Sequence, residues 1–152
     1  MKRAALLMAM LLAGAAPVAA QAPDGAALYK RCAACHLPSG VGVPGAFPPL
    51  QTDFMALARK PAGRRYLALV VIKGIAGPLT IDGKAFRSAM PAQSMLDDAR
   101  IAAVLNHVGR TIAKAGSGFR AFTTAEVAVA RKSGEGLTAA NVGALRATLG
   151  GK

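Results

Sequence analysis

Cys32-Ala33-Ala34-Cys35-His36 is the stretch that decides the fold of this chain, because the spacing C-x-x-C-H is typical of a site where a c-type haem is attached. Two thiols one helical turn apart can each add to one vinyl group of a porphyrin, and the histidine that follows then lies under the iron. The motif therefore predicts one covalent haem c, with Cys32 and Cys35 as attachment residues and His36 as an axial iron ligand.

Two other interpretations of the cysteines are weaker. A thioredoxin-like C-x-x-C is expected beside a βαβ pattern, whereas residues 25–31 have helical character. A zinc site would need four ligands from two cysteines and two histidines, and three of these lie within five residues of one another.

The N-terminus has the features of a secretory signal peptide. Lys2 and Arg3 are basic, residues 4–16 form an apolar run too short to span a membrane, and residues 18–20 are small enough for a cleavage site. The later apolar runs are shorter still. We therefore expect removal of residues 1–20, export to the periplasm and a mature chain without a transmembrane span.

The net charge of the chain indicates which classes of partner it can bind. Taking Lys2 and Arg3 from the 19 basic residues leaves 17 against 7 acidic ones, a net charge of +10 for the 132 residues of the mature chain. Nucleic acid would be the default partner of so basic a cytoplasmic chain, but export excludes it. An acidic docking surface on a redox protein is the better interpretation, although a basic surface can also serve solubility alone.

The remaining pattern predicts an all-α fold with one short β-hairpin. Glycine and proline break residues 37–50 into a loop, and Asp82-Gly83 is a typical two-residue hairpin turn between residues 79–81 and 84–86. Helices are expected at residues 24–35, capped by Asp24, at residues 63–73, and from Leu96 or Asp97 onward. In the last of these helices Ile101, Val104, Leu105 and Val108 form one apolar stripe. A short helical turn is expected at 54–58, capped by Thr52 or Asp53.

A second axial ligand has four candidates. Met90 precedes Pro91, and the residue before proline favours extended backbone, which can deliver a sulfur without a helix in the way. Met95 is the runner-up, one residue before the last strong helix. Met55 fits core packing better. His107, near a helix C-terminus, fits packing or capping better than iron ligation.

Together these elements resemble the class I c-type cytochromes, especially the single-haem cytochrome subunits of bacterial periplasmic dehydrogenases. The resemblance covers Asp24 to Arg110 and rests on an ordered set of motifs: Gly25-x-x-x-Tyr29, Cys32-x-x-Cys35-His36, Gly40-x-Gly42, Phe47-Pro48-Pro49-Leu50, Met90-Pro91 and Asp97-x-x-x-Ile101.

The resemblance also implies details of the structure. The first and last helices of the family cross near the glycine at Gly25, with an aromatic side chain from the last helix packed at the crossing. Here His107 stands where that aromatic is usual. A proline carbonyl of residues 47–49 is implied to accept a hydrogen bond from the His36 ring, which would fix the ring's orientation.

The function expected from this set is single-electron transfer between a dehydrogenase and a terminal acceptor, with iron bound by His36 and Met90 and without catalysis at the metal. The alternative is a haem enzyme or ligand sensor whose sixth iron position is open, in which case Met90 would be incidental.

The C-terminal part lies beyond the resemblance. We expect a cytochrome c domain over residues 21–118 and a helical extension over residues 119–152, which holds a weak repeat at an offset of 15. Each copy reads as a short helix opened by a threonine, the first with a Thr123-x-x-Glu126 capping box. We expect the first copy to dock through Phe122 and Val127 and the second to be looser.

Overall fold

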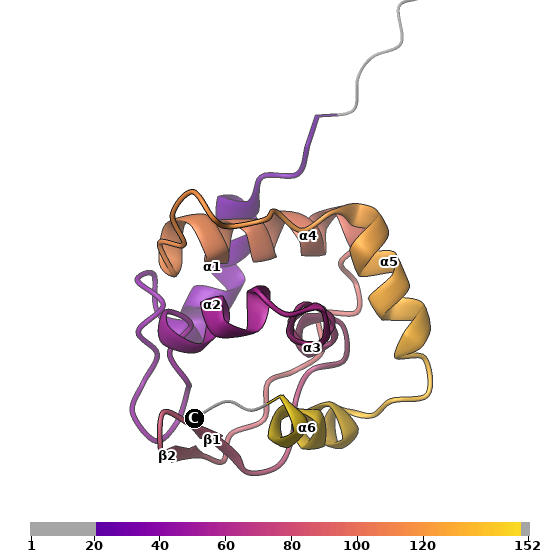
Figure 1. The fold of residues 1–152 in the computed structure, drawn as a ribbon. Coiled ribbons are helices and arrows are strands. Elements are labelled where there is room, and N and C mark those ends of the chain that lie inside the picture. The colour runs from indigo at the N-terminus through magenta and orange to yellow at the C-terminus, as the bar shows by residue number, and fades with distance from the viewer. Residues whose placement is uncertain (1–20, 150–152) are drawn as a thin grey trace, which may run out of the picture.

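The computed structural model describes residues 21–149, so the expected signal peptide at residues 1–20 lies outside the described part. Within that part, helices α4, α5 and α6 surround α3 on three sides, with α1 and α2 beside them and the hairpin next to α6 (Figure 1). The all-α prediction is confirmed. The elements are α1 (Gly25–His36), α2 (Thr52–Ala58), α3 (Pro61–Lys73), β1 (Leu79–Ile81), β2 (Lys84–Phe86), α4 (Asp98–His107), η1 (Val108–Ile112), α5 (Thr124–Ser133) and α6 (Ala139–Thr148).

Helices α1 and α4 cross in direct backbone contact. The Asp24 carboxylate caps α1 by accepting from the backbone N–H groups of Ala26 and Ala27. A Cβ at Gly25 would lie 2.3 Å from the carbonyl oxygen of Ala103 in α4, so only glycine allows this approach. The His107 ring packs on Tyr29 with centroids 5.2 Å apart, and His107 therefore takes the place of the aromatic residue implied by the resemblance.

The middle helices begin differently from the sequence expectation. Helix α2 follows Gln51, whose side chain makes no capping bond, and Asp53 instead binds Arg146 of α6, so the expected cap is wrong. Helix α3 begins at Pro61, two residues before the expected start, because proline suits the first position of a helix, where no N–H partner is needed.

The hairpin and the last strong helix follow the prediction. β1 and β2 pair antiparallel with Ile81 opposite Lys84, and Asp82 and Gly83 both take positive φ angles, as a type I′ turn requires. Asp97 caps α4 by accepting from the N–H of Arg100. Helix α4 then continues into a π-helical segment, η1, which the sequence pattern did not indicate.

Helix α5 docks as expected, through buried Phe122 and fully buried Val127. Its Glu126 carboxylate is not free to complete the expected capping box, because it binds the Arg64 guanidinium of α3. The side chain of Arg64 is only 2% exposed and also stacks on Phe122, 3.8 Å from the ring centroid. Removing one partner of such a buried pair costs about 3–5 kcal/mol.

Helix α6 is packed against α3 and the hairpin, which corrects the expectation of a looser second copy. Val142 is fully buried, a contribution of about 1.5–3 kcal/mol. The complete capping box is here rather than in α5: the Thr138 hydroxyl accepts from the Asn141 N–H, and the Asn141 side chain accepts from the Thr138 N–H. In the described residues, none of the helices is both long and apolar enough to cross a membrane.

The α1–α4 crossing gives the first testable prediction. Gly25→Ala places a methyl group against the Ala103 carbonyl and lowers the free energy of unfolding by about 1–3 kcal/mol, even though alanine favours helices. Denaturant unfolding measures the loss. Gly118→Ala is the control, since a Cβ there meets no neighbouring atom and the backbone is not in the left-handed region. Equal stability of the two variants would contradict the crossing.

Candidate functional site: the haem cavity

A mostly apolar cavity opens between the two hydrophobic clusters of the core. One cluster is built around α1, α4 and α5, and the other around α3, the hairpin and α6. The cavity draws its lining from both, including Cys32, Cys35 and His36 of α1, residues 46–50 of the following loop, Tyr66, Leu67, Val70 and Val71 of α3, Leu79 and Ile81 of β1, residues 88–91, and Val104, Leu105 and Val108.

The two cysteines lie in the last two turns of α1 and both line the cavity. Neither cysteine side chain is fully buried. Burial raises the pKa of the Cys32 thiol, so the thiol form is favoured in the folded chain without haem. The predicted pair is thus brought to one apolar wall, as thioether attachment requires.

His36 is oriented by the loop that follows it. Its Nδ1 lies 2.9 Å from the Pro48 carbonyl oxygen, which can only accept, so Nδ1 carries the proton and Nε2 keeps its lone pair. The residue is 8% exposed, and this burial lowers the pKa of the imidazole, which keeps it in the neutral form that binds metal. The implied proline carbonyl contact is therefore present, at Pro48.

Two glycines shape the loop that follows α1: Gly42 ties it to the end of the helix, and Gly40 ties the two ends of the loop together. Gly42 donates its N–H to the His36 carbonyl, and Gly40 accepts from the Leu50 N–H. A Cβ at Gly42 would lie 2.2 Å from the Phe47 carbonyl oxygen, and the residue has a φ of +68°, so glycine is required there. This tight turn brings the Pro48 carbonyl to the imidazole.

Met90 lies on an extended segment that is pinned at the cavity. Its backbone forms an isolated β-bridge with Ile75, with N–H to O distances of 3.0 and 2.9 Å. A Cβ at Gly74 would lie 2.4 Å from the Met90 carbonyl oxygen, so the glycine that ends α3 also lets this segment approach. The extended backbone predicted from Pro91 is present, and Met90 lines the cavity together with His36.

The other three candidates lie elsewhere. Met95 is 70% exposed, and its sulfur accepts from the Arg31 guanidinium on the surface. Met55 packs against the core cluster and lines a separate surface pocket beside Arg59 and Phe119. His107 is at the α1–α4 crossing. None of the three lines the cavity that holds His36.

The sequence reasoning missed a polar group at one edge of the cavity. Asp53 and Tyr66 line it, and Arg146 from α6 binds the Asp53 carboxylate at 2.7 Å. Burial raises the pKa of Asp53 and raises the pKa of Tyr66 to about 12. The arginine recurs in the C-terminal repeat, at the position of Arg131, but nothing in that pattern indicated that it would bind Asp53, 93 residues away.

The residues of the cavity fit a haem. Two thiols and an oriented, neutral imidazole lie on one short stretch of helix, a thioether lies on another segment of the same cavity, and the rest of the lining is largely apolar. This combination of fold and site defines a c-type haem protein.

Comparison with known proteins agrees with this assignment to the c-type haem proteins. A cytochrome c family model matches residues 22–111. A cytochrome c-552 of Thermus thermophilus is 44% identical over 123 residues, which cover 80% of this chain and 82% of the relative. A second Thermus thermophilus cytochrome c-552 is 42% identical over 106 residues, which cover 68% of this chain and 81% of that relative. The chain belongs to the cytochrome c family, and it is a monohaem electron-transfer protein with one covalent haem c.

Attachment through the two cysteines gives the second prediction. Haem of the wild-type protein stays with the polypeptide through acid-organic extraction, because thioether bonds survive it. The Cys32→Ala/Cys35→Ala variant loses this retention. Single replacements keep one thioether and serve as controls, with the absorbance of the extracted polypeptide as the measurement. Haem that extracts freely from the wild-type protein would refute the assignment.

Proposed function

We propose that this protein is an exported, periplasmic carrier that passes single electrons from a dehydrogenase to a terminal acceptor, with haem iron held by His36 and Met90. One observation carries the ligand assignment: among the described histidines and methionines, His36 and Met90 line the cavity, and Met55, Met95 and His107 do not. Two protein ligands leave no iron position for a substrate, which favours transfer over catalysis.

The bound haem supplies a one-electron ferrous–ferric couple. Cys32 and Cys35 would hold its vinyl side, and the Pro48 carbonyl would keep the His36 ring in one orientation through both oxidation states. The Met90 thioether favours the reduced ion, and the apolar lining disfavours the extra charge of the oxidised one, so both raise the reduction potential.

The ligand assignment gives the third prediction. In the oxidised protein a methionine ligand produces a weak far-red charge-transfer band and strongly shifted methyl resonances. Met90→Ala removes both signals because it removes the only methionine sulfur at the cavity among the described residues. Met95→Ala is the matched control and leaves them unchanged, since Met95 faces solvent.

The reverse result would move the ligand to Met95. Absence of both signals in the wild-type protein would favour the rival function, a haem enzyme or ligand sensor with an open sixth position.

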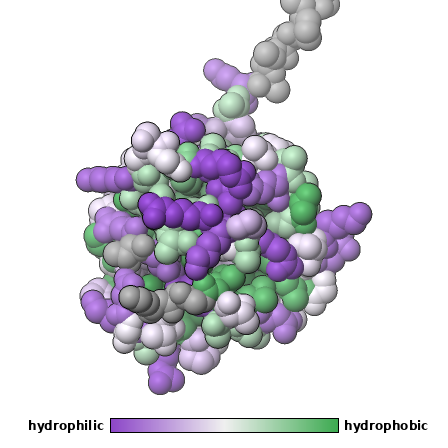
Figure 2. Space-filling view, viewed as in Figure 1, coloured by the Kyte–Doolittle hydropathy of each residue, from purple (hydrophilic) through white to green (hydrophobic). Residues whose placement is uncertain are grey.

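The partner is proposed from charge. Lys30 and Arg31 precede Cys32, Lys84 and Arg87 precede the segment of Met90, and all four are exposed. Hydrophilic and hydrophobic side chains are interspersed over the face seen in Figure 2. A basic rim of these four residues beside the cavity would attract an acidic docking surface on a redox protein and speed the encounter.

The basic rim gives the fourth prediction. Replacing Lys84 and Arg87 by glutamine slows electron exchange with anionic hexacyanoferrate several-fold at low salt, and the effect fades as salt screens it. The control replaces Lys114 and Lys132, which are exposed but do not flank the cavity, and changes the net charge by the same amount. Stopped-flow rates at low and high salt measure both.

Equal rates for the two pairs would show that the net charge acts without a localised rim. Repeating the comparison with the periplasmic dehydrogenase that reduces the protein tests the partner itself.

A further inference from the structure

Two of the arginines that the structure describes are buried, and their surroundings differ. Arg64, which is 2% exposed, uses its guanidinium fully: it binds both carboxylate oxygens of Glu126 and donates to the carbonyls of Ala58, Arg120 and Ala121. Arg146, which is 6% exposed, donates from Nη2 to Asp53. Its Nε and Nη1 are buried without a hydrogen-bond partner.

Unpaired donors of a buried guanidinium are costly, because these groups have lost water and gained nothing in return. The corresponding donors of Arg64 are satisfied, Nε by the Glu126 carboxylate and Nη1 by the backbone carbonyls of Ala58 and Arg120, so the fold can supply acceptors where it needs them. At Arg146 the protein supplies one carboxylate oxygen only. Nε–H and Nη1–H point to different sides of the guanidinium and cannot bind one carboxylate together, so Nη1, next to Nη2 at the free end of the side chain, is the donor left for a second acceptor.

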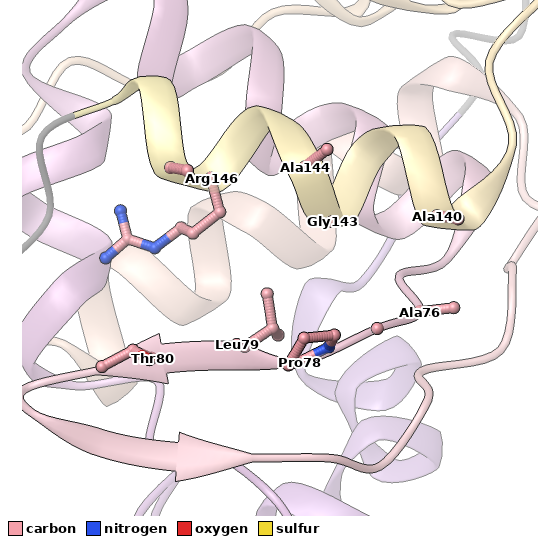
Figure 3. Close-up of a pocket in the computed structure, with 10 residues that line it drawn as sticks. Ala76, Pro78, Leu79, Thr80, Ala140, Gly143, Ala144 and Arg146 are labelled. Carbon is pink, nitrogen blue, oxygen red and sulfur yellow. The ribbon is translucent and has the colours of Figure 1, made fainter.

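The position of Arg146 shows which acceptor can reach it. Its partner Asp53 lines the haem cavity, as do Tyr66, whose ionisation responds to the charge of Arg146, and Leu79. Leu79 also lines the groove between α6 and β1. In Figure 3 the guanidinium lies beyond Leu79, away from the end of the groove where Ala76 and Ala140 face each other. Arg146 does not line the haem cavity itself; its guanidinium lies behind the lining residue Asp53, to which it is bound.

We propose that Arg146 of the C-terminal helix is a cofactor-binding residue that receives a haem propionate with its unpaired Nη1 donor. A haem carries two propionate carboxylates, and a haem held by Cys32, Cys35 and His36 must place them at an edge of the cavity. This inference rests on the haem placement proposed above. It extends the cofactor site beyond residues 22–111, which the family model matches, to helix α6.

Arg146 is the one charged residue of α6 and the cation among acidic neighbours. Burial and the charge of Asp82 raise the pKa of the Asp53 carboxyl, the charge of Arg146 lowers it, and Tyr66 stays protonated because its pKa is about 12. Arg146 would therefore lie between the Asp53 carboxylate and the propionate. It would hold the propionate ionised by lowering its pKa, as an adjacent cation lowers that of a carboxyl group by about 1–3 units.

The proposed contact gives the fifth prediction. It is tested on the haem-containing protein with carbon-13 in the haem propionate carboxyls, so that their infrared bands differ from those of the protein's own carboxyl groups. In the wild-type protein infrared difference spectra between pH 5 and 8 show no labelled, protonated carboxyl band, and the reduction potential is nearly constant. In Arg146→Gln the labelled band appears on the acidic side. The potential then falls as the pH rises, because a propionate that ionises adds negative charge and favours the oxidised iron.

Arg131→Gln is the matched control. Arg131 also ties a C-terminal helix to the core through an aspartate, Asp98, at 2.7 Å, but neither residue lines the haem cavity. It should behave as the wild-type protein does. The label separates the propionate from Asp53, and Asp53→Asn/Arg146→Gln, in which Asp53 cannot titrate, retains the labelled band and the pH-dependent potential.

The inference is overturned if the labelled carboxyl spectrum of Arg146→Gln matches that of the wild-type protein, since Arg146 would then serve Asp53 alone. If Arg146→Gln fails to fold, Arg146→Lys is used instead, because it keeps the charge and loses the planar guanidinium. A shift of the propionate bending frequency in the resonance Raman spectrum of Arg146→Lys supports the inference. An unchanged frequency overturns it. The far-red band of Met90 in every variant reports the haem placement separately.

Discussion

The close crossing of α1 and α4 is the constraint on which the rest of the structure depends. The backbone of Gly25 lies so close to the backbone of Ala103 that no side chain fits between them, so α1 is held against α4 at its N-terminal end. The same helix ends at His36, and both cysteines lie on it. A helix held this firmly turns the sequence C-x-x-C-H into a defined site, because the sulfurs and the imidazole inherit their positions from it.

The other wall of the cavity depends on a second close backbone contact. Gly74 ends α3 and admits the carbonyl of Met90, and the bridge to Ile75 then fixes the extended segment. Glycine is used at both places because a side chain would push the two walls apart. In the proposed ligation by His36 and Met90, both ligands must keep their distance to iron through each change of charge, so rigid backbone contacts serve a carrier better than long, mobile side chains.

The sequence predicted much of this arrangement for local reasons. The C-x-x-C-H spacing, the turn at Asp82-Gly83, the cap at Asp97 and the extended residue before Pro91 each depend on neighbours in the chain, and all are present. The failures involve distant partners. Asp53 and Glu126 were expected to cap helices, but arginines from α6 and α3 bind them, because a buried cation gains more from a carboxylate than a solvated helix end does.

The C-terminal helices show why distance along the chain limits such reasoning. Helices α5 and α6 are too short to be stable alone, and their stability comes from burying Val127 and Val142 in the two clusters that also border the cavity. The chain has no tryptophan and only five phenylalanines, so its core is built largely from smaller aliphatic side chains. Because each of these buries little surface, the stability of the core depends on many of them, including Val127 and Val142. The helices therefore act as part of the cavity's support, and α6 also brings a charged side chain, Arg146, to Asp53 in the cavity wall.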